Sequence, residues 1–374
     1  MKRILYVVLT TMVVCVTVFS AFLVLLKPEK AAPRAIKVAM TPERIERGRY
    51  LFESVADCGG CHSDRDWTRY GAPDKAGRQG AGMVFPPELG FPGSIVARNI
   101  TPDAESGIGK WTDGEKIRAI REGVSRDGHP LFNFMPYEAF AAMSDDDLES
   151  LVAYMNTLPP VRNVLPATRL DFPVSFLNRL SPKPVPGPVN APSRLDPKAY
   201  GAYLVRLAGC IACHSQLDKG KPVRGLEYAG GHTFQIGKLV VNSPNITPDE
   251  ETGLGKWREE RFLTRFQSNR NLSVDNTPPA SQSNFTVMPW ASFSHLKDED
   301  LHAVYAYLRT LRPIYNPVEV HPPQPSNSAA LAGSLAFRCM RTGRRRVGEL
   351  SPRQAGVSGR VSIRPAAPPA WMPV

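Results

Sequence analysis

The sequence has too few cysteines for a disulfide framework. It contains six cysteines in 374 residues, and four of them fall in two short motifs. The other two, Cys15 in an apolar stretch and Cys339 in a basic one, form no obvious pair, which excludes a small disulfide-stapled scaffold. The sequence also lacks a G-x-G-x-x-G dinucleotide loop, a P-loop and a catalytic nucleophile motif. Strand-like alternation is sparse, which argues against a sheet-dominated fold.

The central part of the chain has no strong charge of either sign. The formal net charge is +11, but residues 324–374 hold eight Arg and one Glu, and residues 1–37 hold six Lys or Arg and one Glu. Residues 38–323 hold 32 basic and 33 acidic side chains. The basic balance belongs to the two ends, so we predict no nucleic-acid partner for the body.

A long uncharged run stands near the N-terminus. Residues 4–26 carry no charge over 23 positions, after Lys2 and Arg3 and before Lys27. The run is long enough to cross a bilayer and longer than the usual core of a signal peptide. No small-x-small cleavage site follows it. We therefore expect a transmembrane signal anchor over 4–26, with a removed signal peptide as the alternative.

Two copies of C-x-x-C-H dominate the interpretation. They are Cys58-Gly-Gly-Cys61-His62 and Cys210-Ile-Ala-Cys213-His214. Two thiols one helical turn apart can join the two vinyl groups of one porphyrin, and the next residue supplies the proximal imidazole. A zinc half-site or a redox dithiol could explain C-x-x-C alone, but the histidine that follows argues against both. The motifs predict two covalently attached c-type haems.

The sequence around these motifs is repeated. Four segments recur in the same order: Asn99-Ile-Thr-Pro-Asp103 as Asn245-Ile-Thr-Pro-Asp249, Ser106-Gly-Ile-Gly-Lys-Trp111 as Thr252-Gly-Leu-Gly-Lys-Trp257, Met135-Pro-Tyr137 as Met288-Pro-Trp290, and residues 148–158 as residues 301–311. The second copy contains an insertion around 271–284. That stretch is polar with two prolines, so we predict a surface loop.

Helix signals recur in both copies. Thr41-Pro42 precedes a helix expected over 44–56, Thr112 and Glu115 form a capping-box pattern, and Ser144 is an N-cap candidate for the last helix of the first copy. The second copy repeats the first and last of these helices.

These signals predict an all-α fold. The predicted parts are a transmembrane helix over 4–26, one domain over 40–159, a Pro-rich linker over 160–195, a second domain over 196–314, and a basic low-complexity tail over 323–374 that we expect to be disordered.

A methionine holds an equivalent position in each copy. Met135 and Met288 lie 73 and 74 residues after the histidines of their motifs, and each precedes a proline and an aromatic residue. A methionine as second axial ligand raises the reduction potential and closes the iron, which suits electron transfer. We predict both as sixth ligands. His129 and His232 are the rivals, and neither has a counterpart in the other copy.

Residues 40–315 resemble the membrane-associated multihaem cytochrome c proteins of bacteria, in particular the cytochrome c subunits of periplasmic alcohol, gluconate and aldehyde dehydrogenases. The resemblance is carried by C-x-x-C-H, the Asn-Ile-Thr-Pro-Asp loop, Gly-x-Gly-x-Trp and Met-Pro-aromatic. It implies two tandem class I cytochrome c domains, each with a few helices around one haem. Those subunits typically carry three haem domains, whereas this sequence has two haem motifs.

The function predicted from these features is electron transfer. We expect a dihaem protein at the bacterial inner membrane, with its haem domains in the periplasm. It would pass single electrons from a dehydrogenase or quinol-linked donor to a cytochrome or oxidase. One alternative is a dihaem peroxidase, which needs an open or displaceable sixth position. A redox or ligand sensor is another, but no signalling domain is evident. The predicted cofactor-binding residues are Cys58, Cys61, His62, Met135, Cys210, Cys213, His214 and Met288, and no catalytic acid or base is expected.

Overall fold

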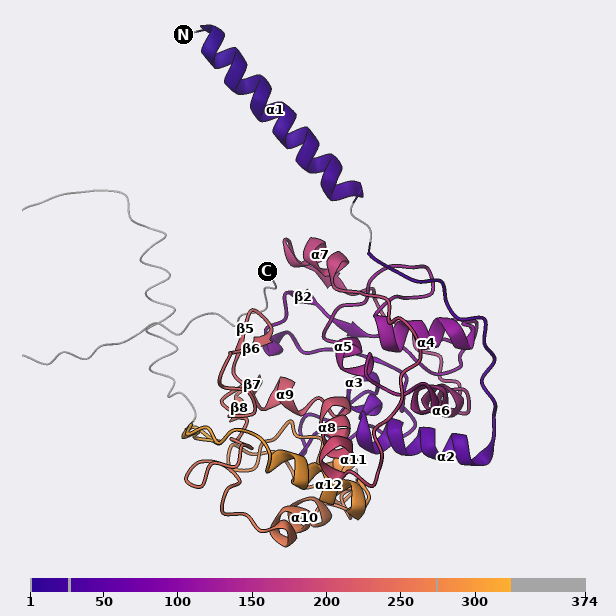
Figure 1. The fold of residues 1–374 in the computed structure, drawn as a ribbon, viewed down its shortest axis with the longest axis vertical. Helices are drawn as coiled ribbons and strands as arrows, with labels where there is room; N and C mark the ends of the chain where they lie inside the picture. Colours follow the sequence, from indigo (N-terminus) through magenta and orange to yellow (C-terminus); the bar gives the residue numbers. More distant parts are fainter. Residues whose placement is uncertain (1, 26–27, 274, 324–374) are drawn as a thin grey trace, which may run out of the picture.

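The computed structural model describes residues 2–25, 28–273 and 275–323 (Figure 1). The α-helices are α1 (Lys2–Leu25), α2 (Pro42–Tyr50), α3 (Cys58–His62), α4 (Asp113–Glu122), α5 (Tyr137–Phe140), α6 (Asp145–Met155), α7 (Val174–Leu177), α8 (Pro197–Leu207), α9 (Cys210–Cys213), α10 (Glu259–Gln267), α11 (Trp290–Phe293) and α12 (Asp298–Leu308). The other helical turns are η1 (Leu51–Val55), η2 (Pro87–Leu89) and η3 (Asn178–Leu180). The strands are β1 (Met83–Val84), β2 (Gly93–Ser94), β3 (Val96–Ala97), β4 (Arg169–Leu170), β5 (Leu217–Asp218), β6 (Lys221–Pro222), β7 (Thr233–Ile236) and β8 (Leu239–Asn242).

The described structure is mostly helical, as predicted, and the helices begin at their capping residues. Thr41 and Ser144 each accept the backbone N–H three residues further on, at 3.3 and 3.1 Å. Thr112 and Glu115 form the reciprocal capping box of α4. The first expected helix is longer than α2 alone, because the π-helical turn η1 continues it. Local side-chain chemistry therefore sets these helix starts.

In the described residues four antiparallel two-stranded sheets accompany the helices, and the sequence does not predict them. They pair β1 with β3, β2 with β4, β5 with β6, and β7 with β8. Their strands are two to four residues long, too short for an alternating pattern to stand out. The longest pair runs from Thr233 opposite Asn242 to Ile236 opposite Leu239.

In both copies the first helix packs against the last, α2 against α6 and α8 against α12 (Figure 1). A glycine lies at each crossing. A Cβ on Gly48 would come within 1.8 Å of the Ser150 carbonyl oxygen, and one on Gly201 within 1.9 Å of the Ala303 carbonyl oxygen. Glycine therefore permits the close approach of the two backbones. We use "first repeat" and "second repeat" below for residues 40–159 and 196–314.

The two repeats share one continuous hydrophobic core. Buried tyrosines join them in a reciprocal way. The Tyr50 hydroxyl of the first repeat donates to Asp300 of the second at 2.6 Å, and the Tyr203 hydroxyl of the second donates to Asp147 of the first at 2.6 Å. The two repeats therefore pack with approximate twofold equivalence at this seam.

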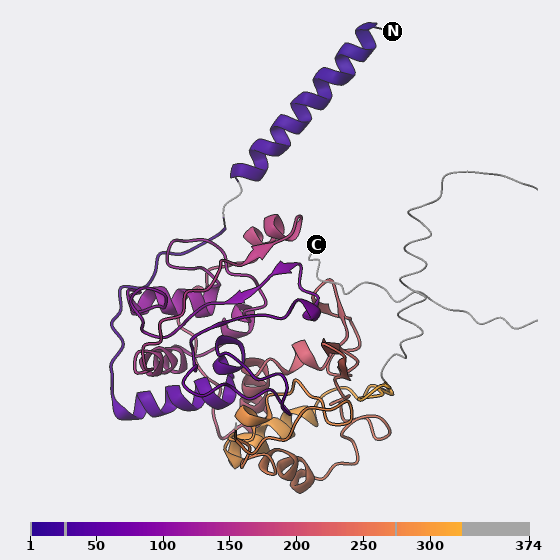
Figure 2. The ribbon, with the colours of Figure 1, turned by 180° about the vertical axis from the view of Figure 1, so that it is seen from behind.

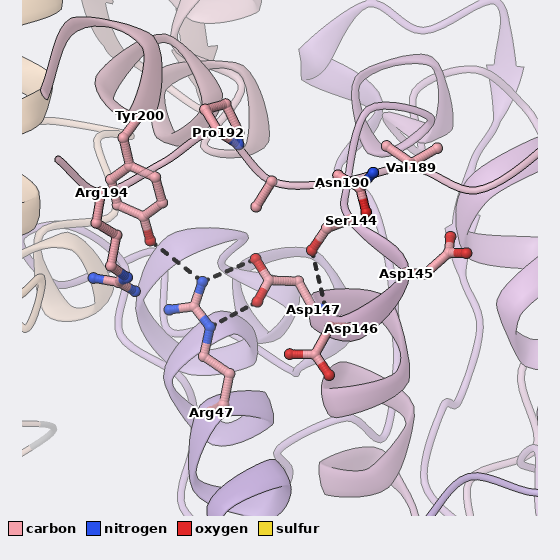
Figure 3. A pocket seen from close by; sticks show the side chains of 11 residues that line it. Arg47, Ser144, Asp145, Asp146, Asp147, Val189, Asn190, Pro192, Arg194 and Tyr200 are labelled. Carbon is pink, nitrogen blue, oxygen red and sulfur yellow. Dashed lines mark hydrogen bonds and ion pairs between the residues drawn. The ribbon is translucent and has the colours of Figure 1, made fainter. Parts of the chain in front are cut away.

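A polar hollow of about 540 Å³ opens at the same seam (Figure 3). Arg47 lies between the carboxylate of Asp147, which it binds through two nitrogens at 2.7 and 2.8 Å, and the Tyr200 hydroxyl at 3.4 Å. Arg194 forms an ion pair with Asp300 at 3.1 Å. The charges that line the hollow are thus paired, and none of its lining residues belongs to a C-x-x-C-H motif.

The connector between the repeats lies along the surface of the first. Its strand β4 pairs with β2, and the Asn178 side chain donates to the Leu131 carbonyl at 3.2 Å. Further on, the Val189 carbonyl accepts the Asp145 N–H at 2.8 Å. These contacts tie the linker expected over 160–195 to the first repeat.

The insertion at 271–284 contacts the first repeat, although the sequence predicted only a surface loop. The Tyr70 N–H donates to the Pro278 carbonyl at 2.9 Å, and the Ala280 N–H donates to the Thr68 carbonyl at 2.8 Å. The Arg69 side chain donates to the Thr277 carbonyl at 2.7 Å. The insertion therefore adds a second seam between the repeats, which a polar composition alone does not reveal.

Helix α1 stands away from the helical body in both views (Figure 1, and from behind in Figure 2). Of the helices that the structure describes, none combines the length and the apolar character needed to cross a bilayer, so the span expected over 4–26 is not found among them. Of the tail expected over 323–374, residues 324–374 lie outside the described residues.

Candidate functional site

Each C-x-x-C-H motif lies on a short helical turn that follows a left-handed residue. Asp57 precedes α3 with φ of 44°, and Gly209 precedes α9 with φ of 65°. The turn brings the two cysteines of each motif to the same side, one turn apart, with the imidazole directly after them. The four motif thiols are free. Figure 1 places α3 and α9 near the middle of the helical body.

Both motif histidines are oriented by a backbone carbonyl. The Nδ1 atom of His62 lies 2.7 Å from the Arg98 carbonyl oxygen, and that of His214 lies 2.9 Å from the Pro244 carbonyl oxygen. Because a carbonyl can only accept, Nδ1 carries the hydrogen and Nε2 keeps its lone pair. Desolvation lowers the pKa of both imidazoles, partly opposed by these hydrogen bonds, and so favours the neutral ring. This is the orientation that a metal-ligating histidine requires.

The Asn-Ile-Thr-Pro-Asp loop holds the carbonyls that orient the histidines. Asn99 directly follows Arg98, and its side-chain oxygen accepts the N–H and the hydroxyl of Thr101 at 2.9 and 2.7 Å. Its amide nitrogen donates to the Val161 carbonyl at 2.7 Å. Asn245, directly after Pro244, makes the equivalent bonds at 2.9, 2.8 and 2.8 Å. The sequence shows this loop only as repeated, and its role in fixing the carbonyls that orient the histidines is evident only from the fold.

The surroundings of the motif cysteines keep their thiols protonated. Desolvation by the neighbouring protein is the main cause, and it raises the pKa of Cys61 and Cys210 to about 12 and that of Cys213 to about 11. The Asp57 charge adds to the rise at Cys61 and Cys213, and Cys213 also adds to the rise at Cys61. The two motifs therefore lie close enough to share one electrostatic environment.

An aromatic cluster lies beside the first motif. Phe85, Phe91 and Phe134 pack edge to face, with ring centroids 4.6 to 5.6 Å apart. Together with Met83 and Ile95 they form an apolar group against which Cys61 packs. The sequence does not predict this cluster, because Phe85 and Phe91 lie in a loop with no periodic pattern.

Met135 and Met288 lie in equivalent loops before α5 and α11. Each carbonyl accepts the N–H two residues further on, at 2.7 and 2.8 Å. Both side chains are half-buried and pack against the core cluster that Cys58 and Cys210 also contact. This placement is compatible with axial ligation, which stays a prediction.

The two rival histidines have other neighbours. The His129 side chain is 62% exposed and pairs with Asp127 at 2.5 Å. The His232 ring stacks on Phe234 with centroids 4.3 Å apart.

Comparison with known proteins agrees with this geometry. Residues 199–312 match the family model described as cytochrome c. This segment is a cytochrome c domain. It contains α9, His214 and Met288.

The chain also has distant relatives, and the similarity to them extends beyond residues 199–312 into the first repeat. The chain is similar to the cytochrome c subunit of alcohol dehydrogenase (quinone) from Gluconacetobacter polyoxogenes, with 29% identity covering 80% of this chain and 65% of that subunit. It is similar to the gluconate 2-dehydrogenase cytochrome c subunit from Pantoea cypripedii, with 30% identity covering 71% and 59%. It is also similar to a diheme cytochrome c-type protein from Cereibacter sphaeroides, with 28% identity covering 78% and 93%. The chain thus spans less than two thirds of the two dehydrogenase subunits.

The side chains of the cytochrome c domain fit a c-type haem. Cys210 and Cys213 supply two unpaired thiols on one turn, and His214 offers a neutral Nε2. The first repeat offers the same donor set. The recognition of a cytochrome c from the motifs is therefore confirmed.

Proposed function

We propose that this protein is a dihaem electron-transfer protein with one c-type haem in each repeat. A bound haem supplies a one-electron couple between ferric and ferrous iron. The observation that carries the proposal is a duplicated contact, in which each motif histidine donates Nδ1–H to a carbonyl fixed by an Asn-Ile-Thr-Pro-Asp loop. A second copy of a complete ligand arrangement supports a second site of the same kind.

The chain's own residues have separate tasks in this proposal. Cys58, Cys61, Cys210 and Cys213 form the thioether bonds. His62 and His214 provide the proximal nitrogen, and the hydrogen bond at Nδ1 fixes the plane of each ring. Met135 and Met288 would provide the second protein ligand to each iron. Two closed sites favour outer-sphere electron transfer over peroxide chemistry.

The arrangement of the repeats supports electron passage between the two sites. Cys213 of the second motif adds to the raised pKa of Cys61 in the first, and Ser292 of the second repeat donates to Asp57 of the first at 2.5 Å. The shared core and the reciprocal tyrosine contacts hold this arrangement. We propose that, with a haem bound at each motif, electrons would pass between the two sites within the chain.

A dehydrogenase is the proposed partner. Similar chains are named as cytochrome c subunits of an alcohol dehydrogenase and a gluconate 2-dehydrogenase. We propose that the present chain accepts electrons from such a subunit, or from a quinol-linked donor, and passes them to a cytochrome or oxidase. The neutral charge balance of residues 38–323 gives no reason to expect nucleic acid as a partner.

Haem counting tests the proposal. The chain, expressed with a cytochrome c maturation system, should carry two haems by pyridine haemochrome assay, and both should be low-spin with spectra typical of His–Met ligation. Cys58→Ser/Cys61→Ser and Cys210→Ser/Cys213→Ser should each bind one haem. A colourless protein or a single haem in the wild type contradicts the proposal. A high-spin site with turnover of hydrogen peroxide favours the peroxidase alternative.

Attachment to the inner membrane is a further part of the proposal, with both repeats in the periplasm. Its support is the sequence, where residues 4–26 are uncharged. No described helix is long and apolar enough to be identified as a transmembrane span. The experiment therefore removes residues 4–26 directly. The full chain should sediment with membranes and dissolve only in detergent, whereas a chain lacking residues 4–26 behind a cleavable export signal should be released. Release of the full chain by salt alone rejects the anchor.

A further inference from the structure

The residue before the first cysteine distinguishes the two sites. At this position Asp57 stands in the first repeat and Gly209 in the second, and both have left-handed backbone dihedrals. Glycine adopts this region freely, whereas a residue with a side chain incurs a strain of about 1 kcal/mol. A strained residue persists where the surrounding structure over-determines it, and the contacts of the Asp57 side chain supply that constraint.

The Asp57 side chain makes a contact across the seam that has no equivalent on the other side. Its Oδ1 accepts the Ser292 hydroxyl at 2.5 Å. The position equivalent to Ser292 in the first repeat is Ala139, four residues after the loop methionine, and alanine cannot donate. The approximate twofold symmetry is therefore broken at this pair.

The motif itself is adapted to this aspartate. A Cβ added at Gly60 would lie 2.0 Å from Oδ2 of Asp57, so the carboxylate occupies the space of a side chain at position 60. The second motif has Ala212 at the equivalent position, beside Gly209, which has no side chain. Asp57 with Gly60 and Gly209 with Ala212 are thus two alternative ways to fill the same volume.

The Asp57 carboxylate makes no close ion pair with the cation that acts on it most strongly. Arg65 is the cation that acts on it, but the guanidinium donates to the carbonyls of Gly60, Gly71 and Ala72 at 3.2, 2.8 and 2.6 Å. The nearby Asp74 carboxylate adds to the negative field. Desolvation raises the pKa of Asp57 to about 6, so the group is ionised above neutral pH.

We propose that Asp57 is a positioning residue that makes the two haem sites unequal, by tethering the first attachment turn to Ser292 and by placing a negative charge beside the first haem. This inference rests on the proposed attachment of haem at both motifs. A nearby carboxylate stabilises ferric over ferrous haem, so it lowers the reduction potential of the site it adjoins. The first haem is affected more than the second, because the carboxylate belongs to the first attachment turn.

The test compares charge removal with loss of the tether. Asp57→Asn suits the left-handed backbone and removes the charge. Asp57→Gly/Gly60→Ala reproduces the arrangement of the second motif without strain. Both variants should bind two haems. In spectroelectrochemical titrations at pH 8, each should raise the reduced-to-oxidised ratio of one haem about three- to tenfold at fixed potential, which corresponds to about 30 to 60 mV, with a smaller rise at the other haem.

Two matched variants separate the roles. Ser292→Ala keeps the charge, so it should lower the thermal unfolding midpoint while changing the potentials less than Asp57→Asn does. Gly60→Ala alone should displace the carboxylate and destabilise the protein, and the added Asp57→Gly should restore stability. Two bound haems with unchanged potentials in both charge-removing variants overturn this inference alone. Fewer than two haems in the wild type overturns the proposed function.

Discussion

Tyr50 and Tyr203 make the same pair of hydrogen bonds in opposite directions across the seam between the repeats. Each hydroxyl donates to an aspartate of the other repeat at 2.6 Å and accepts, at 3.1 Å, the backbone N–H three residues before that aspartate. The acceptors are Asp300 and Asp147, the third residues of α12 and α6, each in the acidic first turn of its helix. The seam is therefore built from two copies of one contact.

Removal of either hydroxyl should weaken the whole protein. Tyr50→Phe leaves Asp300 without its buried donor, and a hydrogen bond to a charged group contributes about 1.5 to 3 kcal/mol to the free energy of unfolding. Tyr203→Phe should cost a similar amount, because each aspartate keeps an arginine partner, Arg194 at Asp300 and Arg47 at Asp147. Urea unfolding of the haem-loaded protein measures the loss. Tyr315→Phe, whose residue is 64% exposed, is the control and should change little.

Neither helix crossing should accommodate a side chain in place of its glycine. Gly48→Ala or Gly201→Ala would place a Cβ within 2 Å of a carbonyl oxygen of the opposite helix, which must then move away. Overpacking of this kind costs about 1 to 3 kcal/mol or more. Thermal denaturation should show a clear drop for both. Glu46→Ala, on the same helix α2 but exposed, is the control, and an equal drop there would contradict the role of the crossing.

The asparagines of the repeated loop should act on their own haem site. Asn99→Ala removes the acceptor for Thr101 and the donor to Val161, and it frees the carbonyl of Arg98 that orients His62. We expect a loss of about 2 to 4 kcal/mol, since buried partners stay unsatisfied, and a shift of one midpoint potential. Asn245→Ala should shift the other. Arg162→Ala, a 70% exposed side chain in the same region, should shift neither.

The methionines should each account for half of the spectroscopic signal of sulfur ligation. Met135→Ala or Met288→Ala should remove about half of the iron–sulfur charge-transfer absorbance and lower the potential of that haem, because methionine ligation raises it. Met40→Leu, a partly exposed methionine outside these loops, should leave the signal intact. Retention of the full absorbance in Met135→Ala would contradict the assignment of Met135 and indicate another iron ligand in the first repeat.

Acid should weaken the protein partly through Asp145. Burial alone would raise the pKa of this carboxyl, but the Arg121 and Arg34 guanidiniums outweigh it and hold the pKa below its ordinary value. The stabilisation is therefore complete above the unfolded-state pKa of about 3.9 and is lost as the pH falls through the lower folded-state pKa.

The variant Asp145→Asn tests this sign. It should be less stable than the wild type at pH 7, and the difference in urea midpoint should shrink at pH 3. Asp146→Asn, on the next residue with a carboxylate that is 77% exposed, should show a smaller difference at pH 7. A difference for Asp145→Asn that grows in acid would contradict the assignment.

The sequence predicted the features that depend on near neighbours. The caps at Thr41, Thr112 and Ser144 lie within three residues of their partners, and the motif cysteines lie within one turn. The role of Asn99 could not be predicted, because it depends on a carbonyl 62 residues away.

The seam between the repeats escaped prediction for the same reason. Tyr50 and Asp300 are 250 residues apart, and nothing near either residue indicates the other. Gly48 and Gly201 could have been found, since both interrupt otherwise helical segments at equivalent positions of the repeat. Aligning the two repeats with each other therefore identifies the two crossing glycines, which neither repeat identifies alone.

The space shared by position 57 and position 60 constrains how the two motifs could have diverged. Aspartate and alanine cannot both occupy it without breaking the contact to Ser292. A stepwise mutational route from one arrangement to the other therefore runs through glycine at both positions, and the order of substitutions is set by sterics. Descendants of a duplicated ancestor would be expected to show either pairing, or the doubly glycine intermediate, far more often than the crowded combination.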